Sequence, residues 1–214
     1  MLMKIRIAII EDHQLVLQSY ELYFKNTGTV KVMDTFNGGT VFQKNFPRIH
    51  HAIDLVLLDL KLPDHKGTDI IGWIKTHYPK VKILVLSSYE DTATIVQCIC
   101  KGADGYMIKN CSYSELEEAI VKVYNHMPHL PDTISWATVK AMTPQMKLIA
   151  SLKPQELEFL QHTASDRSYG EIALLMNKSP KTVDNYRNDL FRKLQVRNRT
   201  GLVLKALAYN LISI

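Results

Sequence analysis

The chain has 214 residues, of which 46% are hydrophobic and 22% are charged. This length suits two small domains better than one, and the hydrophobic content is sufficient for a packed core. No apolar run approaches the roughly 20 residues that a membrane span requires. Lys4 and Arg6 interrupt the apolar start, which argues against a secretory signal. We therefore expect a soluble cytoplasmic protein with no membrane partner.

The net charge of +5 is unevenly distributed. Residues 149–214 hold ten Lys and Arg against six Asp and Glu, whereas residues 1–148 hold sixteen against fifteen. A basic excess in the smaller C-terminal part indicates a polyanionic partner there. The three cysteines, Cys98, Cys100 and Cys111, have no metal-binding or CxxC spacing, so we interpret them as free thiols in a reducing compartment.

Residues 4–124 alternate strand-like apolar runs with amphipathic, helix-like stretches. The expected strands are residues 4–10, 30–36, 55–58, 82–86 and 105–108. The expected helices are residues 13–25, 40–49, 68–76, 92–101 and 112–124. Ser112 and Glu115 resemble a capping box at the start of the last helix. Strict alternation predicts an α/β flavodoxin-like (βα)5 domain with a five-stranded parallel sheet.

Residues 126–149 break this pattern. Pro128 and Pro131 exclude regular helix at the start of the segment. Residues 133–142 are compatible with a short helix, which Thr143-Pro144 is expected to interrupt. We interpret residues 128–148 as a linker between a first domain at residues 1–127 and a second domain at residues 149–214.

The second domain is predicted to be all-α with four helices. The helix-like stretches are residues 155–164, 169–176, 181–194 and 198–210. Pro154 precedes the first of them, and Ser179-Pro180 supplies an N-cap and a first-turn proline for the third. Short helices joined by tight turns, with a basic third helix, predict a helix-turn-helix module.

Polar side chains gather at the ends of the expected strands of the first domain. Glu11 and Asp12 follow the first strand, Asp59 the third and Lys109 the fifth, while Ser87 ends the fourth. The carboxyl ends of parallel strands share one edge, where open α/β sheets bind ligands. Three crowded carboxylates need a shared cation, and oxygen ligands favour Mg2+. A carboxylate beside a metal and a lysine can accept a phosphoryl group.

Each of these residues alone is more often an ordinary loop acid, a turn residue or a solvated lysine. Their joint occurrence at four strand ends is what favours a functional site.

Residues 4–125 resemble the receiver domain of two-component response regulators. The resemblance rests on the acidic pair, on Asp59 followed by Pro63 and Gly67, on Ser87, and on the run from Gly102 to Lys109. It implies that a sensor histidine kinase phosphorylates Asp59. It also implies that Mg2+ is bound by Glu11, Asp12, Asp59 and the backbone carbonyl of Lys61. Lys109 is implied to contact the phosphate, and Ser87 and Tyr106 are implied to form a switch pair.

A phosphohydrolase of the haloacid-dehalogenase type is the enzymatic alternative, because it also uses an Asp at a strand end. Those enzymes need an acid two residues after the nucleophile, and this chain has Lys61 there. We therefore do not expect an enzyme.

The chain from Leu152 onward resembles the LuxR-type helix-turn-helix domain of NarL/FixJ-type response regulators. The resemblance rests on residues 152–156, 171–173, 179–183 and 193–194, with Val196 and Arg199 behind them. It implies that residues 181–194 form the recognition helix in the major groove and that Glu156 makes a structural ion pair. The residues implied to contact double-stranded DNA are Lys178, Lys181, Thr182, Asn185, Arg187, Asn188, Arg192, Arg197 and Arg199.

Asparagine suits bidentate contact with adenine, and the cations suit phosphates. The alternative to DNA binding is that the basic side chains of this helix form an ordinary solvated face that binds no partner.

Two positions of the recognition helix depart from the family pattern. Asp184 and Tyr186 stand where the family often has Lys and His. A carboxylate facing DNA would repel phosphate, so we expect Asp184 to read cytosine, to make an internal pair or to face away.

The resemblance implies a bacterial transcriptional regulator in which phosphorylation of Asp59 controls homodimerisation and DNA binding. Alternatively, the C-terminal domain binds a protein partner, or binds DNA independently of phosphorylation. A steep fall of DNA affinity with salt distinguishes DNA binding from protein binding.

Overall fold

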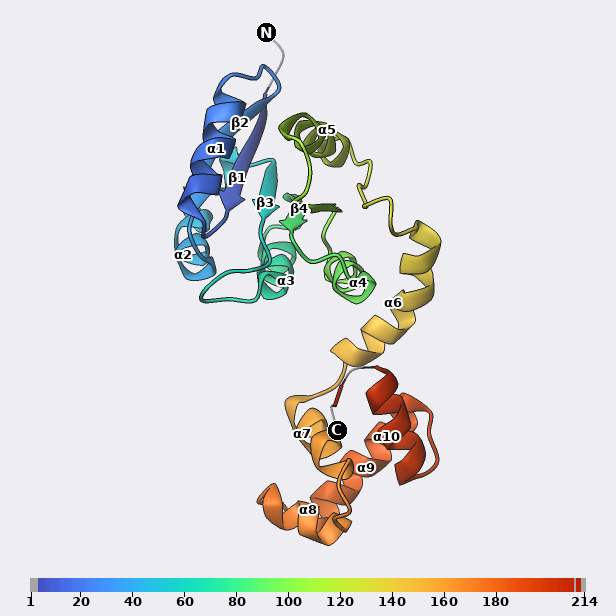
Figure 1. The fold of residues 1–214 in the computed structure, drawn as a ribbon. Coiled ribbons are helices and arrows are strands. Elements are labelled where there is room, and N and C mark those ends of the chain that lie inside the picture. The colour runs from blue at the N-terminus through green and yellow to red at the C-terminus, as the bar shows by residue number, and fades with distance from the viewer. Residues whose placement is uncertain (1–3, 210, 213–214) are drawn as a thin grey trace. The chain divides into compact units, whose positions relative to one another are not determined.

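A computed structural model describes residues 4–209 and 211–212 of the chain. It divides into two compact units, Met1–Thr143 and Pro144–Ile214 (Figure 1). Each unit is described by itself. No helix among the described residues is long and apolar enough to cross a membrane.

The first unit is a five-stranded parallel sheet of order β2-β1-β3-β4-β5, which confirms the predicted fold class. The strands are β1 (Ile5–Ile10), β2 (Val30–Phe36), β3 (Leu55–Leu58), β4 (Lys82–Ser87) and β5 (Gly105–Ile108). The helices are α1 (Gln14–Lys25), α2 (Gly39–Ile49), α3 (Gly67–His77), α4 (Thr92–Cys100) and α5 (Tyr113–Tyr124), with a 3-10 turn η1 at His50–Ala52.

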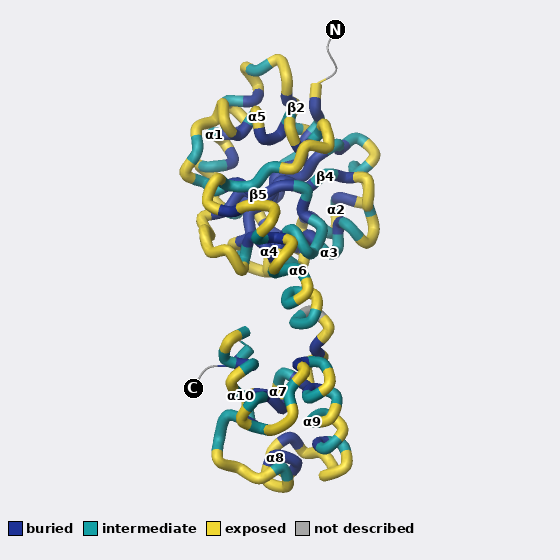
Figure 2. The backbone as a smooth tube through the Cα atoms, turned by 90° about the vertical axis from the view of Figure 1, so that its right-hand side faces the viewer, coloured by how far each residue is buried: buried dark blue, intermediate teal, exposed yellow. Residues whose placement is uncertain are grey.

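The central strands are buried on both faces, as the dark blue interior of Figure 2 shows. Alternate residues of the strands, such as Ile7 and Leu57, share one buried hydrophobic cluster with Phe24 of α1 and Leu116 of α5. Double-sided burial explains why these strands are continuous apolar runs in the sequence. At the start of α5, Ser112 and Glu115 form the predicted capping box.

The predicted break at Pro144 is wrong, because α6 runs without interruption from Trp136 to Ala150. Proline removes one helical hydrogen bond and crowds the preceding turn. Here the Thr143 hydroxyl donates to the Val139 carbonyl at 2.7 Å, and Ile134 and Val139 are buried in the first unit. This packing anchors the start of the helix, and the division between the units falls at the proline.

The second unit contains α7 (Pro154–Thr163), α8 (Tyr169–Leu175), α9 (Pro180–Leu194) and α10 (Arg199–Ala208). These four helices confirm the predicted all-α module; the predicted end of the last helix, at Asn210, lies outside the described residues. Their core includes Phe159, Ile172, Leu190 and Leu202.

Candidate functional site

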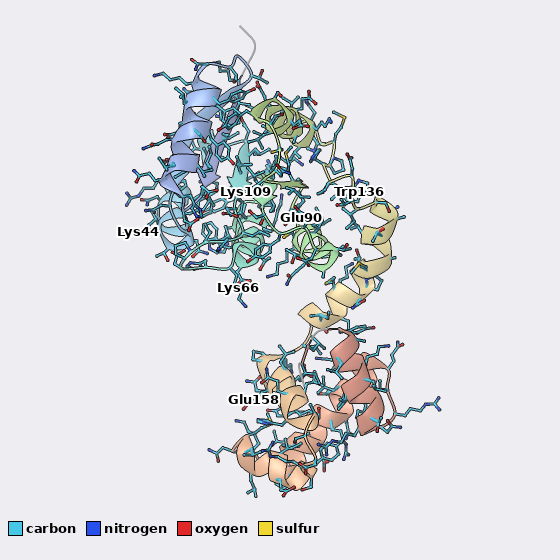
Figure 3. The ribbon with its side chains drawn as sticks, in the orientation of Figure 1. Lys44, Lys66, Glu90, Lys109, Trp136 and Glu158 are labelled. Carbon is cyan, nitrogen blue, oxygen red and sulfur yellow. The ribbon has the colours of Figure 1, made fainter. Side chains whose placement is uncertain are left out.

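The strand ends bring the predicted acidic residues together. β1 lies between β2 and β3, so Glu11 and Asp12 emerge beside Asp59. Lys109 follows β5 and reaches the same edge (Figure 3). Its ammonium donates to Glu11 Oε2 at 2.7 Å and to Asp59 Oδ2 at 2.8 Å. Both carboxylates are almost fully buried, so the lysine supplies the positive charge that their burial requires.

The electrostatics of Lys109 reflect two opposing effects. Burial lowers the pKa of its ammonium, while the hydrogen bonds to Asp59 and Glu11 raise it. The hydrogen bonds and charges prevail, so the pKa lies above its ordinary value. Lys109 therefore carries its positive charge at neutral pH.

Four side chains offer ligand atoms within 4.8 Å of one another: Glu11, Asp12, His13 and Asp59. Asp12 Oδ1 is buried and accepts no hydrogen bond, although His13 Nδ1 lies 2.9 Å away without suitable geometry. A buried oxygen without a donor is costly, and a hard cation would satisfy it. Three carboxylates are the oxygen donors that Mg2+ prefers, so the residues fit the predicted metal.

Sequence reasoning missed His13, which precedes α1. Its backbone N–H and its Nδ1 lie 3.2 and 2.9 Å from Glu11 Oε1. Imidazole is a poor ligand for Mg2+, so we assign His13 to orienting Glu11. The position of His13 directly after the acidic pair was the one signal in the sequence that could have indicated this role.

Lys61 lies beside the predicted phosphoacceptor. Its backbone N–H donates to Asp59 Oδ1 at 3.2 Å, so Asp59 is held through one oxygen by Lys61 and through the other by Lys109. The role of the Lys61 carbonyl as a metal ligand stays a prediction.

The predicted switch residues are both buried. Ser87 Oγ accepts the N–H of Tyr89 at 3.3 Å, and the Tyr106 hydroxyl donates to the Tyr89 carbonyl at 2.7 Å. Burial is the main cause that raises the pKa of Tyr106 above its ordinary value. Tyr106 also donates its backbone N–H to the His129 carbonyl at 2.8 Å, which ties β5 to the segment before α6.

In the second unit, α9 has one buried and one exposed face. Ser179 caps the helix by accepting the N–H of Thr182, and Val183, Leu190 and Leu194 are buried. The opposite face presents a polar stripe at spacings of four, three and four residues. We call it the α9 stripe; its exposed members are Lys181, Asn185, Asn188 and Arg192.

Lys178 and Arg197 are also exposed, near the two ends of α9. Arg192 pairs with Asp189 at 2.7 Å but keeps 78% of its side chain exposed. The Thr182 hydroxyl lies 2.8 Å from Ser179 Oγ, within the helix cap.

Arg199 has a structural position. Its guanidinium donates to the carbonyls of Thr163, Ser165 and Arg167, which belong to the end of α7 and the loop after it. It also lies over the Tyr169 ring, with Cζ 5.4 Å from the ring centroid. These contacts commit the guanidinium within the second unit, and the DNA contact expected of Arg199 stays a prediction.

Two further expectations on the second unit are met. Glu156 is buried and pairs with Lys193 at 2.7 Å, which confirms its predicted structural ion pair. Asp184 pairs with Arg187 at 2.9 Å, which is the internal pair that was one of its three predicted roles.

Comparison with known proteins agrees with this arrangement. Residues 7–121 match the response regulator receiver domain, and residues 150–206 match the bacterial regulatory proteins of the luxR family. The chain is 28% identical over 212 residues to the response regulator protein VraR of Staphylococcus saprophyticus, covering 98% of this chain and 100% of that protein.

Solved structures show the same fold. The chain is similar to RcsB of Salmonella enterica serovar Typhimurium bound to promoter rprA in the presence of the phosphomimetic BeF3−, with a TM-score of 0.53, 23% identity, and coverage of 95% of this chain and 98% of that one. The receiver domain of NarL from Mycobacterium tuberculosis gives a TM-score of 0.53 at 21% identity, over 57% of this chain and 97% of that one.

The chain therefore belongs to the two-component response regulators, as the sequence predicted. Within that class it has the two-domain organisation of a transcriptional regulator, with a receiver domain followed by a luxR-type helix-turn-helix domain.

Proposed function

We propose that Asp59 accepts a phosphoryl group from a phosphohistidine of a sensor kinase, and that this modification controls dimerisation and DNA binding. The observation that carries the proposal is the pairing of the buried Asp59 and Glu11 with the Lys109 ammonium. In the transfer, the P–N bond of the donor breaks and a P–O bond to Asp59 forms.

The residues of the site have distinct roles in this transfer. Glu11, Asp12 and Asp59 would hold Mg2+ together with the Lys61 carbonyl, and the metal would neutralise charge on the incoming phosphoryl group. Lys109, already 2.8 Å from Asp59 Oδ2, contacts the phosphoryl oxygens. This reaction modifies the protein itself in the cytoplasm, and we propose no separate enzymatic activity.

The switch begins at Ser87, whose hydroxyl would bond the new phosphoryl group. Tyr106 is already buried, with its hydroxyl committed to the Tyr89 carbonyl two residues after Ser87. Movement of Ser87 therefore changes the loop that holds Tyr106, and with it β5 and the face of α4 and α5. That face is where we expect two phosphorylated chains to associate.

The second unit would bind double-stranded DNA with the α9 stripe in the major groove. Lys178, Lys181, Arg192 and Arg197 are exposed cations that suit phosphates, and a dimer would place two such helices on paired half-sites. Asp184, whose carboxylate would repel phosphate, pairs with Arg187 within the same helix, and this pairing supports DNA rather than a protein as the partner.

The test measures binding of the full chain to genomic DNA fragments, with Mg2+ and acetyl phosphate or without them. Wild type should take up one phosphoryl group and bind more tightly, with affinity that falls steeply with salt. Asp59→Asn should do neither. Asp69→Asn is the matched control, since Asp69 is an exposed carboxylate paired with Lys101 outside the site. Equal responses from Asp59→Asn and wild type would overturn the proposal.

A further inference from the structure

Arg187 is held beside Asn188 by groups from two helices. Its Nη1 lies 2.9 Å from Asp184 Oδ1. Its Nε and Nη2 both donate to Asn188 Oδ1, each at 3.3 Å. Its Cζ lies 5.2 Å from the ring centroid of Tyr169, the first residue of α8. The guanidinium is therefore committed within the second unit, and its side chain is 30% exposed.

These contacts fix the orientation of the Asn188 amide. A guanidinium has only donors, so the atom facing it must be the amide oxygen rather than the nitrogen. An amide oxygen can accept two hydrogen bonds, and Arg187 donates two to this one. The exposed Asn188 side chain is left with the two hydrogens of Nδ2 and no acceptor to offer a partner.

A donor-only amide reads DNA differently from a free asparagine. Adenine presents an acceptor at N7 and a donor at N6, so the usual bidentate contact needs both atoms of the amide. Guanine presents two acceptors, N7 and O6. Two N–H donors match guanine, while the N6 donor of adenine would find the amide oxygen already used.

We propose that Arg187 is a positioning residue that makes Asn188 select guanine over adenine at one position of each DNA half-site. The inference rests on the proposed binding of DNA by the α9 stripe. Asn185, one turn earlier on the stripe, has no side-chain hydrogen bond among the described residues, so it keeps both the donor and the acceptor that adenine requires.

The test is selection of binding sites from randomised double-stranded DNA by the full chain with Mg2+ and acetyl phosphate. Wild type should enrich guanine at a position that Asn188→Ala makes indifferent. Arg187→Met frees the amide oxygen, so guanine should give way to adenine there, with the preference ratio changing on the order of tenfold. Arg192→Met is the matched control: it removes the same charge from the same helix, and should weaken binding to all sequences without changing any base preference.

Retention of guanine by Arg187→Met, or an unchanged profile for Asn188→Ala, would overturn the inference. If Arg187→Met does not fold, as judged by circular dichroism, Asn188→Asp decides. Its carboxylate should pair with Arg187 and lose the guanine preference, whereas a new preference for cytosine would show that Arg187 does not fix this side chain. Failure of the wild type to bind DNA would instead refute the proposed function along with the inference.

Discussion

The buried ion pair of the second unit gives a stringent test of its architecture. Both carboxylate oxygens of Glu156 accept from Lys193 Nζ, at 2.9 and 2.7 Å, and the Lys153 N–H donates to Oε2 at 2.7 Å. Burial acts to raise the pKa of Glu156, but these partners outweigh it and hold the pKa below its usual value. Lys193→Met would leave a buried carboxylate with a single N–H donor.

The loss in stability should be large. Breaking a buried pair by removing one partner costs about 3–5 kcal/mol, against a total of about 5–15 kcal/mol for a typical domain. For a unit of this size each kcal/mol lowers the melting temperature by roughly 4–8 °C, so the fall should be at least about 12 °C.

The pH dependence of stability should also reverse. In wild type the contribution of Glu156 is complete above its unfolded pKa, near 4.5, and is lost as the pH falls through its lower folded pKa. Without Lys193, burial dominates and raises the folded pKa of Glu156. The variant should therefore be most stable in acid and lose stability as the pH rises through that value.

Urea unfolding of the full chain can separate the two units. Both tryptophans, Trp73 and Trp136, lie in the first unit, so their fluorescence reports that unit, whereas far-ultraviolet circular dichroism reports both. Lys193→Met should shift part of the dichroism transition to lower urea and leave the fluorescence transition in place. Lys181→Met, on the exposed face of the same helix, should shift neither. A loss below about 1 kcal/mol, or a pH profile like that of wild type, would refute the assignment of a buried pair.

Three further predictions concern the first unit. Lys109→Met should increase the rise in melting temperature on adding Mg2+, because Glu11 and Asp59 lose their resident cation; an equal rise in variant and wild type would contradict this. Gly67→Ala should destabilise the receiver by about 1–3 kcal/mol in urea unfolding, because the new Cβ would lie 2.5 Å from Leu60 Cα and 2.9 Å from the Asp59 carbonyl oxygen. Gly72→Ala is the control, because its new Cβ would meet nothing within 4 Å. Burial, aided by Lys122, lowers the pKa of His129 below 6.5, so stability should fall as the pH drops through and below that value. His129→Gln should flatten that part of the fluorescence-monitored profile.

The acidic site could be located from the sequence because parallel topology leaves little freedom. Once the apolar runs before Glu11, Asp59 and Lys109 are recognised as neighbouring parallel strands, their ends must meet at one edge. Helix α9 could also be predicted from the sequence, because its buried residues Val183 and Leu190 recur at helical spacing. Hydrophobic periodicity predicts the helices and strands, and the end of each helix or strand fixes where the residues that follow it lie.

Features that depend on particular tertiary contacts could not be predicted in this way. Arg199 bonds carbonyls more than thirty residues earlier in the chain, and no periodicity connects those positions. The helix through Pro144 depends on the burial of Val139 in the first unit, which outweighs a local preference that pointed the other way. Arg187 was interpreted as a phosphate ligand, although its neighbours in the sequence already included the partners Asp184 and Asn188.

The route from the acidic site to the linker can be followed through hydrogen bonds of one residue. The Tyr106 hydroxyl donates to the carbonyl of Tyr89, which lies two residues after the predicted switch residue Ser87. The Tyr106 backbone N–H donates to the His129 carbonyl. β5 is an edge strand, so the described residues offer this N–H no other strand to pair with. Leaving it unsatisfied while buried would cost about 1–3 kcal/mol. A shift of Tyr106 therefore has to carry His129 with it or break this bond, and either outcome acts on the segment that leads into α6.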